Sequence, residues 1–347
     1  MAGLSDILTA IQNGVTALND LGKQVFGSFN NILGQLTTNA TAIAALQANA
    51  SGLPQGRLTL QTLTPVMSTT QSGKTTIFYT PYHGNIVPIY DGTNMVPTSF
   101  SEISVATTDT TKNPAAIGAS KVNDWFVWND AGTTRIGHGP DWTSDTARSA
   151  GTALIMVNGI LLNNVSITNG PAASRGTYVG TTRSNASSQL DWILGVSGGG
   201  TAGFLNVWNT YNRRWVSTSA SPGAASYTYT TATVRQAAGT TETQVSFVSG
   251  LGEDCFDASY NQVITLTANV GSFVEIGIGL DSTTTRFKSG AVQNGVAVAA
   301  QFQAVAKGSV NPQLGFHFVA GLELGDGAHA NTFFGQAYAS LVLGGMF

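Results

Sequence analysis

The side chains that could act in acid–base catalysis or bind a metal are scattered along this chain of 347 residues. Its histidines include no pair at the His-x-x-x-His spacing of helical metal sites. The best candidate is the segment Gly137–Asp141, in which His138 stands three residues before a carboxylate. That spacing would allow an acid–base pair or a metal ligand set, but a solvated loop is the interpretation we favour. The histidines are His83, His138, His317 and His329.

Two further segments match binding motifs only in part. Glu253, Asp254 and Asp257 flank the single cysteine, Cys255, but their spacing differs from the alternating ligands of a calcium loop. The sequence SGKT at residues 72–75 ends like a phosphate-binding P-loop, yet Ser68 occupies the position of the motif's first glycine. We therefore expect no catalytic residue, no metal and no cofactor.

Composition argues in the same direction. Charged residues make up 10% of the chain, whereas about 25% is usual in a soluble domain. The net charge is −3, and 15 lysines and arginines spread thinly cannot form the basic surface that nucleic acids require. The apolar stretches fall far short of the roughly 18 residues that span a bilayer. We predict a protein that is not an enzyme, binds no nucleic acid and does not insert into a membrane.

Aromatic residues cluster in two places, where they could stack on sugars or anchor an interface. The clusters are Trp125, Phe126 and Trp128, and Trp208, Tyr211 and Trp215. We favour the interpretation that these rings fill the core of a β structure.

The first structural element that the sequence predicts is a long helix near the N-terminus. Between residues 4 and 46, thirteen positions follow one another at alternating steps of four and three residues, and eleven are apolar. This heptad pattern is typical of a coiled coil, and a helix of that length would measure about 63 Å. The thirteen positions, which we call the heptad face, are Leu4, Leu8, Ile11, Val15, Leu18, Gly22, Val25, Phe29, Ile32, Leu36, Asn39, Ile43 and Leu46.

Details of the pattern predict an assembly of three chains. Apolar residues at neighbouring e and g positions widen the heptad face, which suits three strands or a socket in another protein better than a dimer. Asn39, at a d position, would fix register and strand number at some cost in stability. Each helix glycine costs about 1 kcal/mol relative to alanine, so the helix needs a partner. The alternative is a helical hairpin, broken near Gly22, that folds onto the β region of its own chain. The widening residues are Ile7, Leu21, Phe26 and Leu33.

After Pro54 the pattern changes to strands, with apolar and threonine residues alternating at period two. The strongest hairpin signal is Asn158-Gly159 between two apolar arms, which favours a type I′ turn. The small-residue segment Gly195–Gly203 indicates a boundary. The predicted strands include residues 75–79, 86–90, 125–128, 134–136, 154–157, 160–162, 227–234, 244–248, 263–267, 273–278, 296–305, 316–324 and 337–343.

These patterns predict a mainly β protein in three parts. Residues 1–54 form a helical, coiled-coil-like segment for attachment and trimerisation. Residues 55–194 and 195–347 form two antiparallel β domains of the β-sandwich type, and the whole assembles as a homotrimer.

A series of short segments runs in order through residues 57–282. They are Arg57–Leu60, Tyr79–Asn85, Ile89–Gly92, Asp124–Asn129, Trp142–Arg148, the Asn158-Gly159 hairpin, Tyr178–Thr181, Val207–Arg213 and Ile278–Asp281. Together they resemble a module of the tail fibre proteins of tailed bacteriophages. The resemblance implies a virion protein, usually trimeric, that links the tail to the host surface, and it supplies no catalytic residue. Residues after about 283 fall outside it, and such fibres commonly bind their receptor at this tip.

The resemblance and the physical pattern lead to one expected function. We expect a bacteriophage tail fibre that attaches to the tail, or to another virion protein, through residues 1–54. The second β domain would contact a host surface receptor, either a polysaccharide or a protein. Residues 1–11 contain no lysine or arginine and so lack the basic start of a secretory signal, which predicts assembly in the host cytoplasm and action outside the cell as part of the virion.

Two alternatives stay open. One is a head fibre or a neck or capsid decoration protein, with the same helix in a portal or capsid socket. The other is a tailspike polysaccharide depolymerase, because a pair of catalytic carboxylates can come from distant strands.

Overall fold

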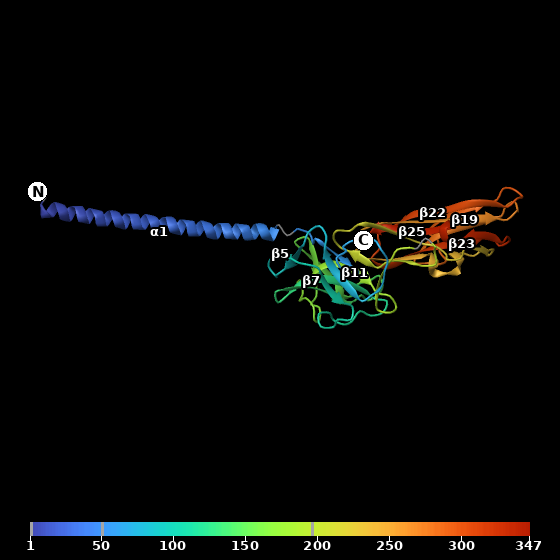
Figure 1. The fold of residues 1–347 in the computed structure, drawn as a ribbon, viewed down its shortest axis with the longest axis horizontal. Helices are drawn as coiled ribbons and strands as arrows, with labels where there is room; N and C mark the ends of the chain where they lie inside the picture. The colour runs from blue at the N-terminus through green and yellow to red at the C-terminus, as the bar shows by residue number, and fades with distance from the viewer. Residues whose placement is uncertain (1–2, 50–51, 196–197) are drawn as a thin grey trace. The chain divides into compact units, whose positions relative to one another are not determined.

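A computed structural model describes residues 3–49, 52–195 and 198–347 of the chain. The protein is mainly β, with one N-terminal helix followed by several sheets (Figure 1). The chain divides into a helical unit up to residue 51 and a compact unit of residues 52–347, which we call the β body.

Helix α1 runs without a break from Leu4 to Asn49, which is 46 residues or about 69 Å. It passes straight through Gly22, where space is open around the Cβ position. Threonine hydroxyls on the helix, such as that of Thr37, donate to the backbone carbonyl oxygen four residues earlier, so their hydrogen bonds are made inside α1. The alternative of a hairpin broken near Gly22 is therefore wrong. Among the described residues, no helix combines the length and apolar character needed to cross a bilayer.

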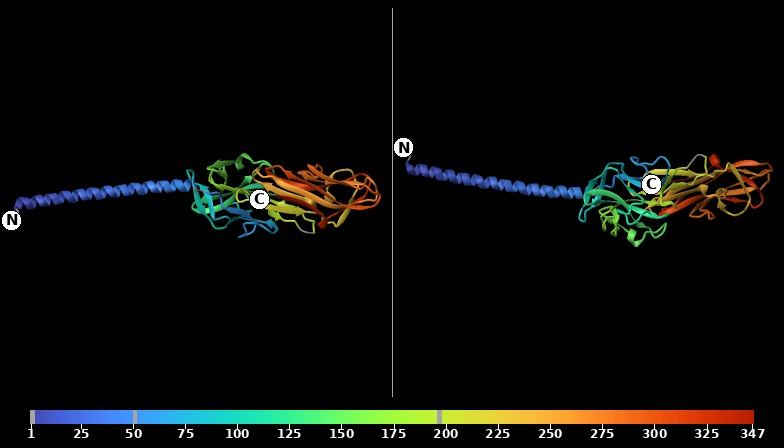
Figure 2. Two further views of the ribbon diagram at one scale, coloured as in Figure 1. Left: turned by 90° about the horizontal axis from the view of Figure 1, so that it is seen from above. Right: turned by 60° about the horizontal axis from the view of Figure 1, so that its bottom comes forward.

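The part of the β body that follows α1 contains two small sheets and a six-stranded sheet (Figure 2). The three-stranded sheet has the order β1-β3-β6, with β1 Gly56–Thr59, β3 Thr76–Pro81 and β6 Ile103–Ala106. The two-stranded sheet pairs β4, Ile86–Tyr90, with β5, Met95–Ser99. The six-stranded sheet has the order β8-β7-β11-β10-β9, with β14 also on β11: β7 Val122–Asp130, β8 Thr133–Asp141, β9 Leu154–Val157, β10 Ile160–Asn163, β11 Thr177–Arg183 and β14 Val207–Asn209.

Two further sheets, of eight and six strands, make up the rest. The eight-stranded sheet has the order β2-β12-β13-β18-β23-β20-β21, with β17 also on β23: β2 Gln71–Lys74, β12 Leu190–Ile193, β13 Gly203–Leu205, β17 Arg235–Gln236, β18 Gln244–Ser249, β20 Phe273–Leu280, β21 Lys288–Gln293 and β23 Gly315–Gly325. A second six-stranded sheet has the order β15-β25-β19-β24-β16, with β22 also on β19: β15 Trp215–Ala220, β16 Ser226–Tyr229, β19 Phe256–Leu266, β22 Ala300–Val310, β24 Asn331–Phe334 and β25 Ala339–Met346. Short 3₁₀ turns lie at Ala150–Thr152, Ala237–Gly239, Thr241–Thr243 and Gln336–Tyr338.

The eight-stranded sheet crosses the boundary predicted between residues 194 and 195. Trp192 of β12 pairs with Leu205 of β13, and β2 lies on the other side of β12. Strands β13 and β18 run parallel, so the prediction of purely antiparallel sheets is wrong at this pair. The long connection between them, residues 206–243, provides the crossover that a parallel pair needs.

The expected hairpin at Asn158-Gly159 is confirmed. Both turn residues have positive φ, 50° and 81°, as a type I′ turn requires, and Ile160 pairs with Val157 across it.

The strand predicted over residues 296–305 is wrong in its first part, because β22 begins only at Ala300. Its partner β19 ends at Leu266, which lies opposite Ala300. Asn294 still pairs with the backbone of residues 271 and 272, but residues 295–299 continue as a loop, although their valines alternate as in a strand. The strand predicted over 227–234 likewise ends early, at Tyr229.

Candidate functional site

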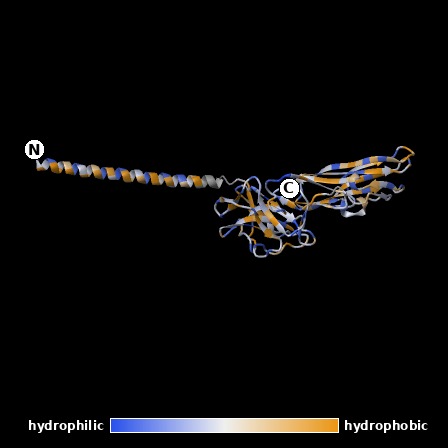
Figure 3. Ribbon diagram, in the orientation of Figure 1, coloured by the Kyte–Doolittle hydropathy of each residue, from blue (hydrophilic) through white to orange (hydrophobic). Residues whose placement is uncertain are grey.

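The most extended candidate surface in the described chain is the heptad face of α1. Its apolar residues with described side chains each expose more than half of their surface in the single chain, from 55% at Ile43 to 86% at Leu4. Figure 3 shows hydrophobic residues recurring along the whole helix. Monomeric proteins rarely expose contiguous apolar surface on this scale. The side chain of Leu46, the last heptad position, lies outside the described residues.

Charge is placed away from the heptad face. The charged residues of α1 are Asp6, Asp20 and Lys23, which occupy the outer positions f, f and b of the heptad. Lys23 and Asp20 pair with each other at 3.3 Å and are well exposed. An apolar face with charges only on the opposite side is the arrangement that association of helices requires.

The interpretation of His138 as part of a solvated loop is wrong. Strand β8 continues through it to Asp141, and the imidazole is buried, with its ring centroid 5.3 Å from that of Trp125. Burial lowers the pKa of the imidazole, whose Nδ1 lies 2.7 Å from the carbonyl oxygen of Gly139. Residues three apart on a strand face opposite sides, so Asp141 accepts instead from Asn123 Nδ2, at 2.9 Å.

Two carboxylates of the acidic cluster around Cys255 pair with one arginine, and the third, Asp257, accepts from Ser309 Oγ at 2.8 Å. The Arg213 guanidinium pairs with Glu253 at 3.0 Å and also with Asp254. Across residues 3–49, 52–195 and 198–347, no group of three or more His, Cys, Asp or Glu side chains is arranged to hold a metal ion. Residues 72–74 lie in strand β2, which agrees with the rejection of a P-loop.

The two aromatic clusters mostly fill the core, as expected. Trp125, Phe126, Trp128 and Trp208 are buried. Tyr211 is half-buried, and Trp215, on the outermost strand of its sheet, β15, exposes 56% of its surface.

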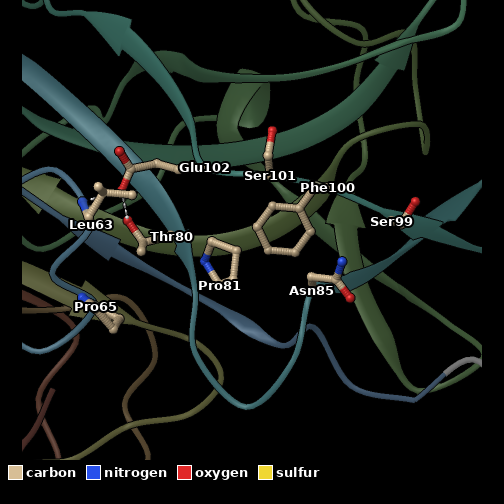
Figure 4. A pocket seen from close by; sticks show the side chains of 9 residues that line it. All are labelled: Leu63, Pro65, Thr80, Pro81, Asn85, Ser99, Phe100, Ser101 and Glu102. Carbon is tan, nitrogen blue, oxygen red and sulfur yellow. Dashed lines mark hydrogen bonds between the residues drawn. The ribbon is translucent and has the colours of Figure 1, made fainter.

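An open groove of about 640 Å³ lies beside β3 (Figure 4). Glu102 is the acidic residue among those that line the groove. Its carboxylate accepts hydrogen bonds from Leu63 N and Thr80 Oγ1, both at 2.6 Å, and from Thr62 Oγ1 at 2.5 Å. Burial raises the pKa of Glu102, but these bonds together lower it below its ordinary value. A carboxylate that is ionised and already accepts three hydrogen bonds is poorly placed to donate a proton. Glu102 is therefore better placed to fix the loop that contains Thr62 and Leu63. The lining residues are Leu63, Pro65, Thr80, Pro81, Asn85, Ser99, Phe100, Ser101 and Glu102.

His317 forms the clearest titratable contact in the β body. Its Nδ1 lies 2.7 Å from Asp281 Oδ2 and its Nε2 lies 3.1 Å from the carbonyl oxygen of Leu314. Burial by itself would lower the pKa of His317. The hydrogen bond to Asp281 and the negative charge of that carboxylate outweigh burial, so the net shift of the pKa is upward. Both ring nitrogens can donate only in the imidazolium form.

This geometry predicts a pH dependence of stability. The contribution of His317 should be complete below pH about 6.5, the pKa of an unfolded histidine, and should be lost as the pH rises through the higher folded pKa. We expect the melting temperature to fall by a few degrees over that interval, and the fall to be smaller in His317→Gln. Thermal melts of both proteins across the same pH series measure the difference. If the melting temperatures of the two proteins fell equally across the pH series, His317 would not be the group responsible.

Neither a protein-family model nor a curated protein matches this chain. Distant similarity to solved structures includes a CocE/NonD family hydrolase from Staphylococcus aureus, at 7% identity over 42% of this chain and 40% of that chain, with a TM-score of 0.21. It also includes infectious bursal disease virus, Gx strain, at 12% identity over 80% and 69% of the two chains, with a TM-score of 0.23. The mosquito-larvicidal Cry4Aa toxin from Bacillus thuringiensis has 8% identity over 81% and 50%, with a TM-score of 0.19. The chain thus spans less than half of the hydrolase, and TM-scores this low carry no argument about fold or function.

Proposed function

We propose that the protein is a virion structural protein, the subunit of a homotrimeric bacteriophage tail fibre. Residues 1–54 attach it to the tail, and the β body contacts the host surface. The observation that carries the proposal is the unbroken helix α1, which exposes a continuous apolar heptad face and keeps its charges on the outer side. Such a helix is stable in water only when other chains cover that face.

The width of the apolar surface supports three chains. Ile7, Leu21, Phe26 and Leu33 flank the heptad face, and each exposes about half or more of its surface in the single chain. In a dimer most of this flanking surface would stay in water, whereas a third helix would cover more of it.

The β body and the resemblance to tail fibres support the rest of the proposal. Its strands carry uncharged threonine, serine and glycine residues, and the groove beside β3 holds a carboxylate engaged with its own loop. The segments that resemble tail fibres cover residues 57–282, which form most of the body.

Asn39 offers a test of the coiled coil itself. Replacing it with leucine should raise the melting temperature of the helical assembly, because a polar amide leaves the interior. The same change should relax the choice of strand number and produce a mixture of oligomers. Circular dichroism melts and sedimentation velocity measure the two effects. A variant that melts no higher and stays a uniform trimer would contradict a buried position for Asn39.

The role in the particle is tested with a truncation and with labelling. Deleting residues 1–54 should abolish incorporation into particles, while the full chain should be incorporated. Antibody labelling of purified phage should mark the tail. Labelling at the neck or capsid would show that the protein is a head fibre or decoration protein and not a tail fibre. Unlabelled particles would overturn the virion role.

A further inference from the structure

Two neighbouring loops of the β body expose valines and contain no charged residue of their own. The loops, residues 267–272 and 294–299, join β19 to β20 and β21 to β22, and we call them the tip loops. Val270, Val296 and Val298 expose 67%, 53% and 63% of their surfaces. The tip loops contain no charged and no aromatic residue.

Buried polar residues hold the tip loops together. Asn294 is almost fully buried, and its Nδ2 donates to the carbonyl oxygens of Thr267 and Val298, both at 2.8 Å. The backbone N–H of Gly271 donates to the Asn294 carbonyl at 2.8 Å, and Asn294 N–H returns a bond to Ser272 at 2.8 Å. The valines are thus presented on a fixed frame.

The frame also engages the buried polar side chains of the tip loops, whereas Asn269 is exposed and donates to Thr267 Oγ1 at 3.2 Å. Asn331, on β24, accepts from Ser272 Oγ at 2.8 Å and from Thr267 N at 3.0 Å. The adjoining side chains of Asp326 and His329 contact each other, with Oδ2 2.6 Å from Nδ1. What the tip loops offer to a partner is therefore mostly methyl groups.

The tip loops lie at the end of the β body that is remote from its first sheets (Figures 1 and 2). At the start of β23, Phe316 N–H donates to the Asp145 carbonyl at 2.8 Å. At the other end of the strand, Gly325 pairs with Val274, next to the first tip loop. Phe316 and Gly325 are nine residues apart on β23, which is about 30 Å.

We propose that the tip loops are a docking surface for an uncharged, apolar patch of a protein on the host cell. This inference rests on the proposed tail fibre function and selects between its two receptor classes. A polysaccharide needs aromatic rings to stack on and free polar side chains to bind its hydroxyls. The tip loops contain no ring, the buried Asn294 amide bonds to the loop backbone and the Ser272 hydroxyl bonds to Asn331, so Asn269 is the one exposed amide of these two loops. Valine methyls instead suit an apolar protein surface, which contributes through area removed from water.

The test is binding of the labelled full-length protein to cells of the strain that the phage infects. The variant V270T/V296T/V298T keeps the shape of each side chain but adds a hydroxyl that docking would bury. We expect binding at least about tenfold weaker than wild type. Val305, on β22, is also about half exposed but lies outside the tip loops, so Val305→Thr is the matched control and should bind like wild type.

Two treatments of the cells separate the receptor classes. Protease treatment should abolish binding of the wild-type protein, and periodate oxidation of surface sugars should leave it unchanged. Raising the salt from about 0.05 M to about 0.5 M should have little effect, because no charge pair is involved. Thermal melts check that each variant is folded, and V270T and V298T alone, one on each loop, decide the matter if the triple variant unfolds.

The proposal would be overturned if the triple variant bound like the wild type, or if binding were lost to periodate but not to protease. Dissociation of the triple variant into monomers would also overturn it and would assign the surface to a second copy. Wild-type protein that fails to bind the cells would also overturn it. In that case the labelling of particles still decides the virion role separately.

Discussion

Replacing Ile32 with aspartate is expected to convert the proposed homotrimer into single chains. Ile32 occupies a d position midway along α1, and its side chain would lie in the dry interior of the coiled coil. Three carboxylates would meet in one layer there, and each buried charge without a partner costs several kcal/mol. Sedimentation equilibrium should return the mass of one chain, 35.9 kDa, instead of about three times that value.

The neighbouring residue provides the control for this experiment. Asn31 occupies an outer c position, so Asn31→Asp adds the same charge to the same turn on the water-facing side. We expect it to leave the trimer intact. Equal behaviour of the two variants would show that Ile32 does not face an interior, and a wild-type protein that sediments as a single folded chain would overturn the trimer.

The second large effect is expected at Asp124, which is fully buried in β7. Arg148 donates to it through Nε at 2.7 Å and through a terminal nitrogen at 3.1 Å, and Thr181 Oγ1 donates at 2.6 Å. The same guanidinium also donates to the carbonyl oxygen of Gly250 at 2.7 Å, so this ion pair ties the first sheets to the end of β18. Asp124→Ala leaves Arg148 buried without its carboxylate and should lower the free energy of unfolding by about 3–5 kcal/mol.

An exposed ion pair gives the matched comparison. Asp130 pairs with Arg135 at 2.6 Å and with Lys112 at 2.7 Å, but these side chains are about a third exposed or more. Asp130→Ala should therefore cost no more than about 1 kcal/mol. Urea unfolding followed by tryptophan fluorescence measures both variants. A loss at Asp124 as small as that at Asp130 would refute a structural role for the buried pair.

Short-range patterns predicted the elements well where one chain segment decides its own structure. The helix was predictable because its apolar period is a property of consecutive residues, and the register continues across Gly22. The turn at Asn158-Gly159 was predictable because both positions require positive φ, which asparagine and glycine adopt readily.

The candidate site was predictable only in its helical part. His138 was misinterpreted because the glycines and the proline around it indicate a turn, whereas pairing with β7 extends β8 through them. No pattern in the neighbouring sequence marks Glu102 or the tip loops, because the residues that they bond to lie far away in the chain. Thr80 is 22 residues from Glu102. Asn331, which bonds to Ser272 of the first tip loop, is 59 residues from it.

By itself the sequence determined a long amphipathic helix, a mainly β remainder and a low density of charge, because these depend on composition and on periods of two and 3.6 residues. The tertiary structure alone decided which strands pair, that β13 and β18 run parallel, and that Val296 and Val298 belong to a loop. The reason is that a strand satisfies its backbone hydrogen bonds on a neighbour that can be distant in the chain. A period-two segment such as residues 296–299 becomes a loop when no such neighbour is present.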